Sequence, residues 1–244
     1  MFRRIFASGL LAGLLAGLFV AVLQQATTVP LIQFAETFEQ GGEADTAAHA
    51  HDHGEKPHDH GDSHDHAGNG HDHGEGWMPE DGIERIFYTA LSSVVIGCGW
   101  ALMLVALVAI SGRRLDARSG ILWGAAGFVA TALAPAVGLP PELPGSMAAE
   151  VDARILWWIG TVVASAIALW LMVFTPGRIA TAAGIVLLAL PHIIGAPQPD
   201  HFGGPVPPEL SAQFVAVSLA LAAVFWTVLG WLAGMFWTRF GQEA

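Results

Sequence analysis

Six apolar runs constrain the fold of this chain more than any other feature. They are residues 5–29, 86–110, 121–137, 155–174, 179–194 and 214–236. A helix that crosses the hydrocarbon of a bilayer needs about 20 residues with a lower limit near 17, so the third run is marginal and the fifth is short. We predict an all-α, polytopic helical bundle with about six transmembrane helices, or five if the first is cleaved or the fifth is re-entrant.

Composition agrees with a membrane protein. The chain is 53% apolar and only 13% charged, and it has nine tryptophans, which excludes an ordinary soluble domain. The single cysteine, Cys98, lies within an apolar run and allows neither a disulfide framework nor a cysteine zinc site. We expect it to be a small packing residue.

The first run has features of two kinds of segment. Arg3 and Arg4 precede it, as in a secretory signal, but it is longer than the usual apolar core of such signals and no Ala-x-Ala site follows. Gly9, Gly13 and Gly17 recur every fourth residue, which favours close packing against another helix. We expect the run to be retained as a transmembrane helix.

Between residues 48 and 74 the triplet His-Asp-His occurs four times, and nine of the eleven histidines lie there. Imidazole binds transition metals, and the interleaved carboxylates add oxygen ligands. The candidate metal ligands in this segment are His49, His51, Asp52, His53, His58, Asp59, His60, His64, Asp65, His66, His71, Asp72 and His73. A plain solvated linker is the alternative interpretation of such a composition.

The basic residues predict the orientation, because short loops rich in lysine and arginine stay in the cytoplasm. With six spans and a cytoplasmic N-terminus, seven of the ten basic residues fall inside: Arg3, Arg4, Arg113, Arg114, Arg118, Arg178 and Arg239. Of the 21 acidic residues only Asp116 and Glu243 fall inside, which leaves 19 outside. We predict cytoplasmic N- and C-termini and a cation-attracting outer surface that carries the histidine segment.

Two further outer connections carry candidate ligands. Residues 138–145 present Glu142 among three prolines, and the last outer loop contains His192, Asp200 and His201. We interpret Glu142, His192 and His201, with Asp200, as the rim of a vestibule that accepts a metal ion. The alternatives are that His192 is a packing residue, that Asp200 and His201 point apart, and that the proline loop only ends a helix.

Polar residues near the helix ends have structural interpretations. Glu150 and Arg154 are four residues apart and are expected to pair across one helical turn. Gln24 and Gln25 either line a polar path or bond to a neighbouring helix. Trp77, Trp157, Trp158 and Trp237 are expected to anchor helices at the membrane interface.

Catalytic motifs are absent. The only lysine, Lys56, follows Glu55, so the chain has no phosphate-binding loop, and it has neither a Gly-x-Ser-x-Gly elbow nor a His-Glu-x-x-His pair. We therefore do not expect an enzyme. Nor do we expect a nucleic-acid partner.

Several segments together resemble the CbtA family of proposed bacterial cobalt transporter subunits. They are the glycine-striped first run, the His-Asp-His segment, and residues 77–85, 123–128, 134–145 and 190–197, of which the block Ala-Pro-Ala-Val-Gly-Leu-Pro-Pro-Glu-Leu-Pro-Gly is the most specific. The resemblance covers nearly the whole chain. It implies cobalt uptake linked to cobalamin synthesis, a bacterial inner-membrane location, and a small single-span, histidine-bearing partner of the CbtB type.

These observations define one functional prediction. Residues 1–35 form the first transmembrane helix, residues 36–83 a largely disordered outer metal-binding loop, and residues 84–244 a bundle of about five further spans in the lipid bilayer. The chain takes up a divalent transition metal: the resemblance favours cobalt, and the residues alone leave nickel and zinc open. The alternative is a membrane-anchored metal buffer or sensor without transport activity.

Overall fold

The computed structural model describes residues 1–48, 82–201 and 203–242, and every regular element in these ranges is a helix. In chain order they are α1 (Phe2–Ala26), α2 (Thr28–Ala48), α3 (Ile83–Ser111), α4 (Ala117–Phe128), the π-helix η1 (Val129–Leu133), α5 (Ala134–Ala136), α6 (Val151–Phe174), α7 (Arg178–Ile194) and α8 (Pro208–Gln242). The predicted all-α membrane bundle is confirmed.

Five helical segments within the described ranges are long and apolar enough to span a membrane. They are Phe2–Ala26, Ile83–Ser111, Ala117–Ala136, Val151–Phe174 and Pro208–Gly241. The run that seemed marginal is one of them, because α4, η1 and α5 continue one another. The fifth apolar run forms α7, which has 17 residues and a length of about 25 Å, shorter than a hydrocarbon layer of about 30 Å.

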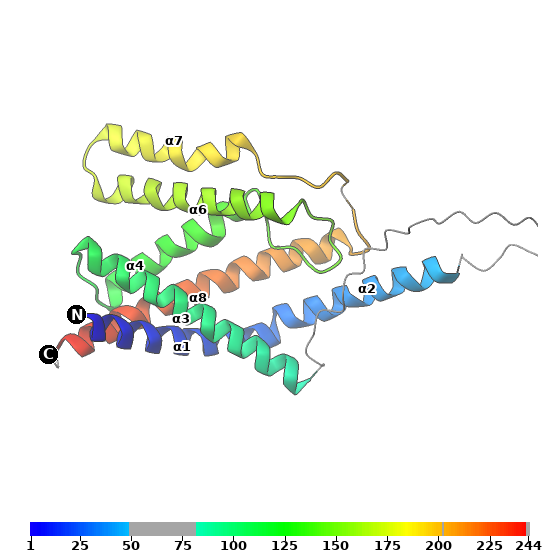
Figure 1. Cartoon of the computed structure of the whole chain (residues 1–244), viewed down its shortest axis with the longest axis horizontal. Coiled ribbons are helices and arrows are strands. Elements are labelled where there is room, and N and C mark those ends of the chain that lie inside the picture. The colour runs from blue at the N-terminus through cyan, green and yellow to red at the C-terminus, as the bar shows by residue number, and fades with distance from the viewer. Residues whose placement is uncertain (49–81, 202, 243–244) are drawn as a thin grey trace, which may run out of the picture.

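Helix α7 nevertheless runs alongside α6 (Figure 1). With α7 in place, both chain termini lie at the same end of the bundle. Pro191 lies within its last turn, and Gly195, with a φ of +90°, ends it. The bundle therefore consists of five long helices and one short one.

The core lies where α1, α3, α4 and α8 meet. Ala12 and Ala16 of α1, Val105 of α3 and Leu229 of α8 are fully buried in one cluster. Since α1 supplies part of this core, its removal would expose apolar surface on both α3 and α8. Its packing fits the expectation that the first run is a structural helix.

Glycine permits the closest helix contacts. A Cβ atom added at Gly17 would lie 2.6 Å from the Cα atom of Val94, so α1 and α3 touch through their backbones, as the glycine stripe predicts. A second contact of this kind joins α4 to α8. It brings Gly120 and Gly124 against Gly230, where a Cβ added to Gly230 would lie 3.0 Å from the Cα atom of Gly124.

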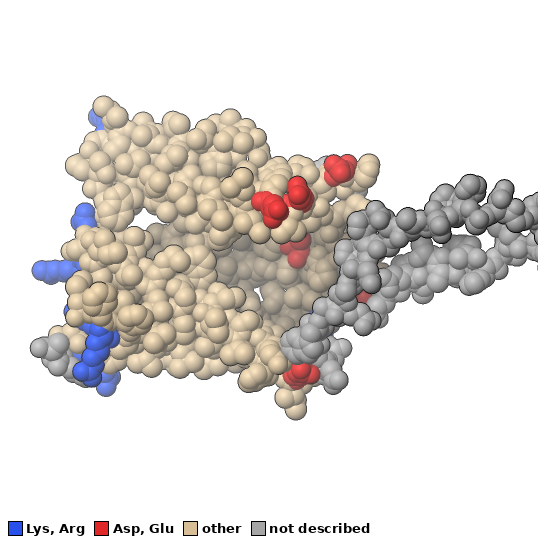
Figure 2. Space-filling model, in the orientation of Figure 1, with Lys and Arg blue, Asp and Glu red and all other residues tan. Residues whose placement is uncertain are grey.

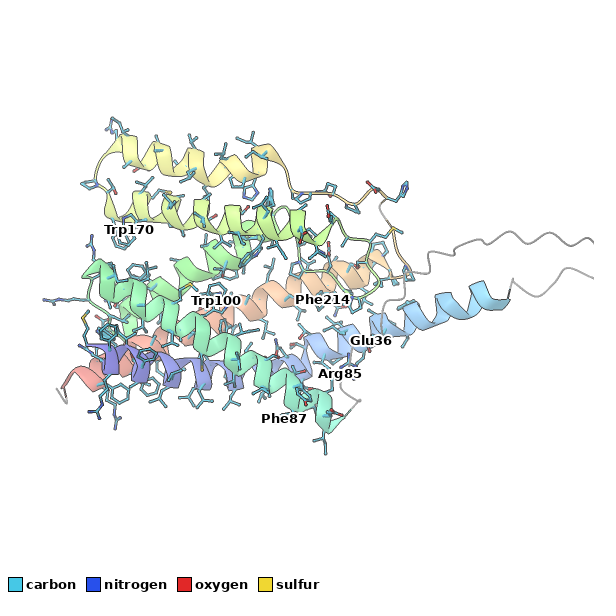
Figure 3. The ribbon with its side chains drawn as sticks, viewed as in Figure 1. Glu36, Arg85, Phe87, Trp100, Trp170 and Phe214 are labelled. Carbon is cyan, nitrogen blue, oxygen red and sulfur yellow. The ribbon has the colours of Figure 1, made fainter. Side chains whose placement is uncertain are left out.

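Helix α2 continues the direction of α1 beyond the bundle (Figure 1). It extends to Ala48, so residues 36–48, predicted to belong to a largely disordered loop, are helical. Arg85 of α3 holds the first half of α2 in place. Both of its Nη atoms donate to Glu36 of α2, with a distance of 3.2 Å between Nη1 and Oε2 (Figure 3). Gln24 also bonds to the neighbouring helix, because its Oε1 accepts from Ser93 Oγ at 2.9 Å.

Charge is sorted along the bundle axis. Figure 2 shows arginines gathered at one end and carboxylates near the other. The arginine end carries both termini, the connection from α3 to α4 and the connection from α6 to α7. We call these the basic end and the acidic end.

Candidate functional site at the acidic end

The site is built around the connection from α5 to α6. The amide of Leu139 donates to Pro135 O at 2.8 Å, and Pro140 and Pro141 then prevent the helix from continuing. A turn follows in which Ser146 N donates to Leu143 O at 3.2 Å, with Pro144 and a positive-φ Gly145 at its centre. These are the residues that a type II turn requires.

Leu143 anchors this connection. Its side chain is only 3% exposed and packs in a second apolar cluster with Ala35 of α2, Val206, and Leu210 and Phe214 of α8. Because the neighbouring prolines fix the backbone, burial of Leu143 also fixes the position of Glu142. The loop therefore holds its carboxylate in a defined place.

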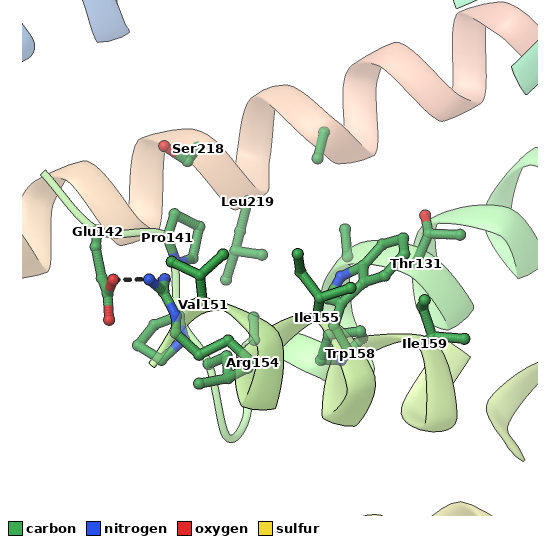
Figure 4. Close-up of a pocket in the computed structure, with 16 residues that line it drawn as sticks. Thr131, Pro141, Glu142, Val151, Arg154, Ile155, Trp158, Ile159, Ser218 and Leu219 are labelled. Carbon is green, nitrogen blue, oxygen red and sulfur yellow. Dashed lines mark hydrogen bonds and ion pairs between the residues drawn. The ribbon is translucent and has the colours of Figure 1, made fainter. Parts of the chain in front are cut away.

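Glu142 accepts a hydrogen bond from Arg154 of α6, with 2.6 Å between Oε2 and Nη2 (Figure 4). The predicted pairing of Arg154 with Glu150 is wrong, because the proline loop brings Glu142 within reach of the guanidinium. The side chains of Arg154 and Glu142 are 30% and 29% exposed, so the pair remains in contact with solvent. The buried Nε of Arg154 has no hydrogen-bond partner.

A cavity of about 610 Å³ lies next to this pair, between α6, α8 and the segment from η1 to the proline loop. Glu142 and Arg154 lie toward one end of it and Thr131 toward the other (Figure 4). Ser218 of α8 adds a hydroxyl to a wall that is otherwise mostly hydrocarbon. The cavity thus has one charged end and mostly apolar walls.

Thr131 lies in the π-helix, and a proline explains that irregular turn. Pro135 has no N–H to donate to the carbonyl four residues earlier, and Ala134 N donates to Val129 O, five residues back. Thr131 Oγ1 donates to Gly127 O at 2.8 Å. We did not predict this element; the sequence Thr131-Ala-Leu-Ala-Pro135 is its only sign.

The other vestibule candidates do not gather around Glu142. His192 lies on α7, where its ring packs edge-on against Trp157 with 5.9 Å between centroids, and its buried Nδ1 has no partner. Asp200 and His201 are exposed. In the ranges that the structure describes, no three His, Cys, Asp or Glu side chains lie close enough to hold a metal ion.

Two of the predicted anchor tryptophans make specific contacts. Trp157 Nε1 donates to Pro191 O at 3.3 Å, and the guanidinium of Arg4 stacks on Trp237 with 4.1 Å between Cζ and the ring centroid. Trp158 lines the cavity. Trp77 and the thirteen histidine and aspartate candidates from His49 to His73 lie outside the described residues.

A helical bundle with several membrane-length helices, opposite charges at its two ends and a cavity beneath a carboxylate defines a multi-pass membrane protein. The family model described as probable cobalt transporter subunit (CbtA) matches residues 2–238, and the chain belongs to this family. Being a subunit implies a further subunit in the assembly. No curated protein and no solved structure matches the chain.

Proposed function

We propose that this chain takes up a divalent transition-metal ion, cobalt, through a bacterial inner membrane. The His-Asp-His segment captures the ion, and Glu142 receives it at the acidic end of the bundle. The support is the family, the composition of the segment, and above all the Glu142–Arg154 pair at the end of the 610 Å³ cavity.

The direction of transport follows from the charge sorting. Arginine-rich connections remain cytoplasmic, so we place the basic end inside and the acidic end and the histidine segment outside. An inside-negative potential then favours inward movement of a dication by about 4.6 kcal/mol per 100 mV. Carboxylates at the outer end raise the local concentration of the ion.

The ion pair with Arg154 explains how Glu142 binds the metal ion only transiently. When no metal ion is present, the guanidinium compensates the carboxylate; an arriving dication competes for the same oxygens and displaces it. Competition weakens binding, and weak binding is what transfer requires, because a tight site would retain the ion. Arginine therefore returns to Glu142 as the ion moves on.

One carboxylate cannot bind cobalt alone. We propose that histidines complete the ligand set: those of the His-Asp-His segment, His192 and His201, or those of a small CbtB-type subunit. His192 has a buried, unpartnered Nδ1 near this end, which is the observation that favours its inclusion. Selectivity for cobalt over nickel or copper would then depend on geometry and supply, since imidazole binds all three.

Uptake of labelled cobalt, nickel and zinc by cells that express the chain, with and without its partner subunit, tests the proposal. We expect Glu142→Gln to abolish uptake and deletion of residues 49–73 to raise the half-saturating concentration while leaving maximal uptake measurable. Glu209→Gln, which removes an acidic-end carboxylate that does not line the cavity, is the matched control. Loss of all activity on deletion, with no effect of Glu142→Gln, would favour the buffer or sensor alternative.

A further inference from the structure

A second hollow lies in the basic half of the bundle. It is a cleft of about 600 Å³ between α3, α4, α6 and α8, and it shares only Thr131 with the cavity at Glu142. Its walls are mainly aromatic and aliphatic and include four indoles, those of Trp100, Trp123, Trp170 and Trp226. Trp100 and Trp170 are labelled in Figure 3 on α3 and α6, which flank the cleft.

Two arginines place positive charge at one end of this cleft. Arg113 and Arg114, from the connection between α3 and α4, both line it and are both exposed. Arg113 reaches across to α6, where its Cζ lies 4.6 Å from the centroid of Phe174. The nearby carboxylate of Asp116 accepts from Ser119 N at 2.8 Å, and Arg118, in the first turn of α4, adds a further positive charge.

These features do not suit a path for metal ions. The cleft walls offer hydrocarbon and indole rings, which do not ligate a divalent transition metal, and two guanidinium groups at the end repel a cation. An apolar hollow of this kind is not filled by water either. Its occupant must be apolar along most of its length and anionic at one end.

The length of the cleft suits an acyl chain. The residues of α4 and η1 that line it run from Ser119 to Thr131, a distance of about 18 Å at the helical rise. One leaflet contributes about half of a hydrocarbon layer of about 30 Å, which is close to this length.

We propose that this cleft binds one anionic phospholipid. An acyl chain lies between the indoles, and the headgroup phosphate accepts charge-assisted hydrogen bonds from Arg113 and Arg114, as planar guanidinium groups commonly donate to phosphate. The lipid fills the gap between α3 and α6 and ties both helices to α4. This site is separate from the proposed metal path, so either proposal can fail without the other.

Native mass spectrometry of the full-length chain, purified in detergent and offered phosphatidylglycerol or phosphatidylcholine, tests the site. We expect one phosphatidylglycerol to be retained with a preference of about tenfold, the scale of a single favourable charged contact. Arg113→Gln with Arg114→Gln should remove the preference. Arg178→Gln with Arg239→Gln, which removes two charges at the same end but outside the cleft, should preserve it.

A change of volume tests the acyl chain separately from the headgroup. Ala166→Phe fills the cleft and should reduce the amount of lipid retained, whereas Ala125→Phe, on an exposed face of α4 outside the cleft, should not. Melting temperatures verify that both variants fold. Equal retention of the two lipids by the wild type, equal loss in both arginine double variants, or a small membrane protein retained in place of lipid would each overturn the proposal.

Discussion

Arg154 donates to Glu142 across twelve residues of sequence, 2.6 Å from Nη2 to Oε2 (Figure 4). Both side chains are about one-third exposed, so the ion pair contributes little to folding, about 0–1 kcal/mol. The importance of the pair is electrostatic. The Arg154 guanidinium places a displaceable positive charge beside the carboxylate that we propose as a metal ligand.

Replacing Arg154 should therefore strengthen metal binding. Arg154→Gln removes the competing cation, and we expect the half-saturating cobalt concentration for uptake to fall by about tenfold, which corresponds to a change of about 1.4 kcal/mol. Arg154→Lys, which keeps the charge, is the control and should change it less. A weaker apparent affinity in Arg154→Gln would show that the guanidinium positions Glu142 instead of competing with the ion.

Backbone contact between helices gives a prediction about stability. Gly124→Ala would place a methyl group against the backbone of Trp226, and we expect a loss of about 1–3 kcal/mol from overpacking. Gly99→Ala is the matched control, because nothing lies within 4 Å of a Cβ atom at that position of α3. Unfolding in mixed micelles, followed by circular dichroism, compares the two. Equal stability of the two variants would mean that α4 and α8 can move apart without loss of folding free energy.

The fold could be predicted because membranes restrict it. Hydrocarbon forces each spanning segment to satisfy its own backbone hydrogen bonds, so apolar runs directly indicate helices. The Gly9-Gly13-Gly17 stripe predicts a packing face by the same local logic. The α4–α8 contact has a comparable pattern, Gly120-Gly124 and Gly230-Gly234, but glycine spacing does not identify the partner helix.

The site was harder to predict because its geometry is nonlocal. Glu150 is four residues from Arg154, but Glu142 is its partner because burial of Leu143 beneath α8 determines where the proline loop runs. The π-helix at Thr131 can be predicted only if it is known that the helix continues through Pro135 instead of ending before it. Sequence spacing describes one helix at a time, whereas the Glu142–Arg154 pair depends on how separate segments pack together.

The Glu36–Arg85 pair should couple α2 to α3. A double-mutant cycle with Glu36→Gln and Arg85→Gln isolates their interaction from other contacts of Arg85, and we expect about 0.2–1 kcal/mol. High salt should reduce this coupling, because both side chains are partly exposed. A coupling that persists unchanged in 1 M salt would contradict an exposed ion pair.

Asp116 gives a prediction about pH. Its pKa is lowered below the ordinary value, first because Ser119 N donates to the carboxylate at the start of α4. A lowered pKa means that the charged cap stabilises the folded state at neutral pH and that this stabilisation is lost as the pH falls through the lowered pKa. The difference in melting temperature between wild type and Asp116→Ala should thus shrink only in acid. Asp116→Asn, which can still cap the helix, should show no such pH dependence.

Sided labelling tests the orientation on which the direction of transport depends. Cys98 is the only cysteine, so a Cys98→Ser background allows single thiols to be introduced. In cells with a permeabilised outer membrane, a membrane-impermeant maleimide should label Ser63→Cys, within the histidine segment, but label Arg118→Cys only after the inner membrane is disrupted. The reason is that the arginine-rich connection stays in the cytoplasm. Labelling of Arg118→Cys alone in intact inner membranes would reverse the orientation, and the histidine segment would then meet the metal ion after transport instead of before it.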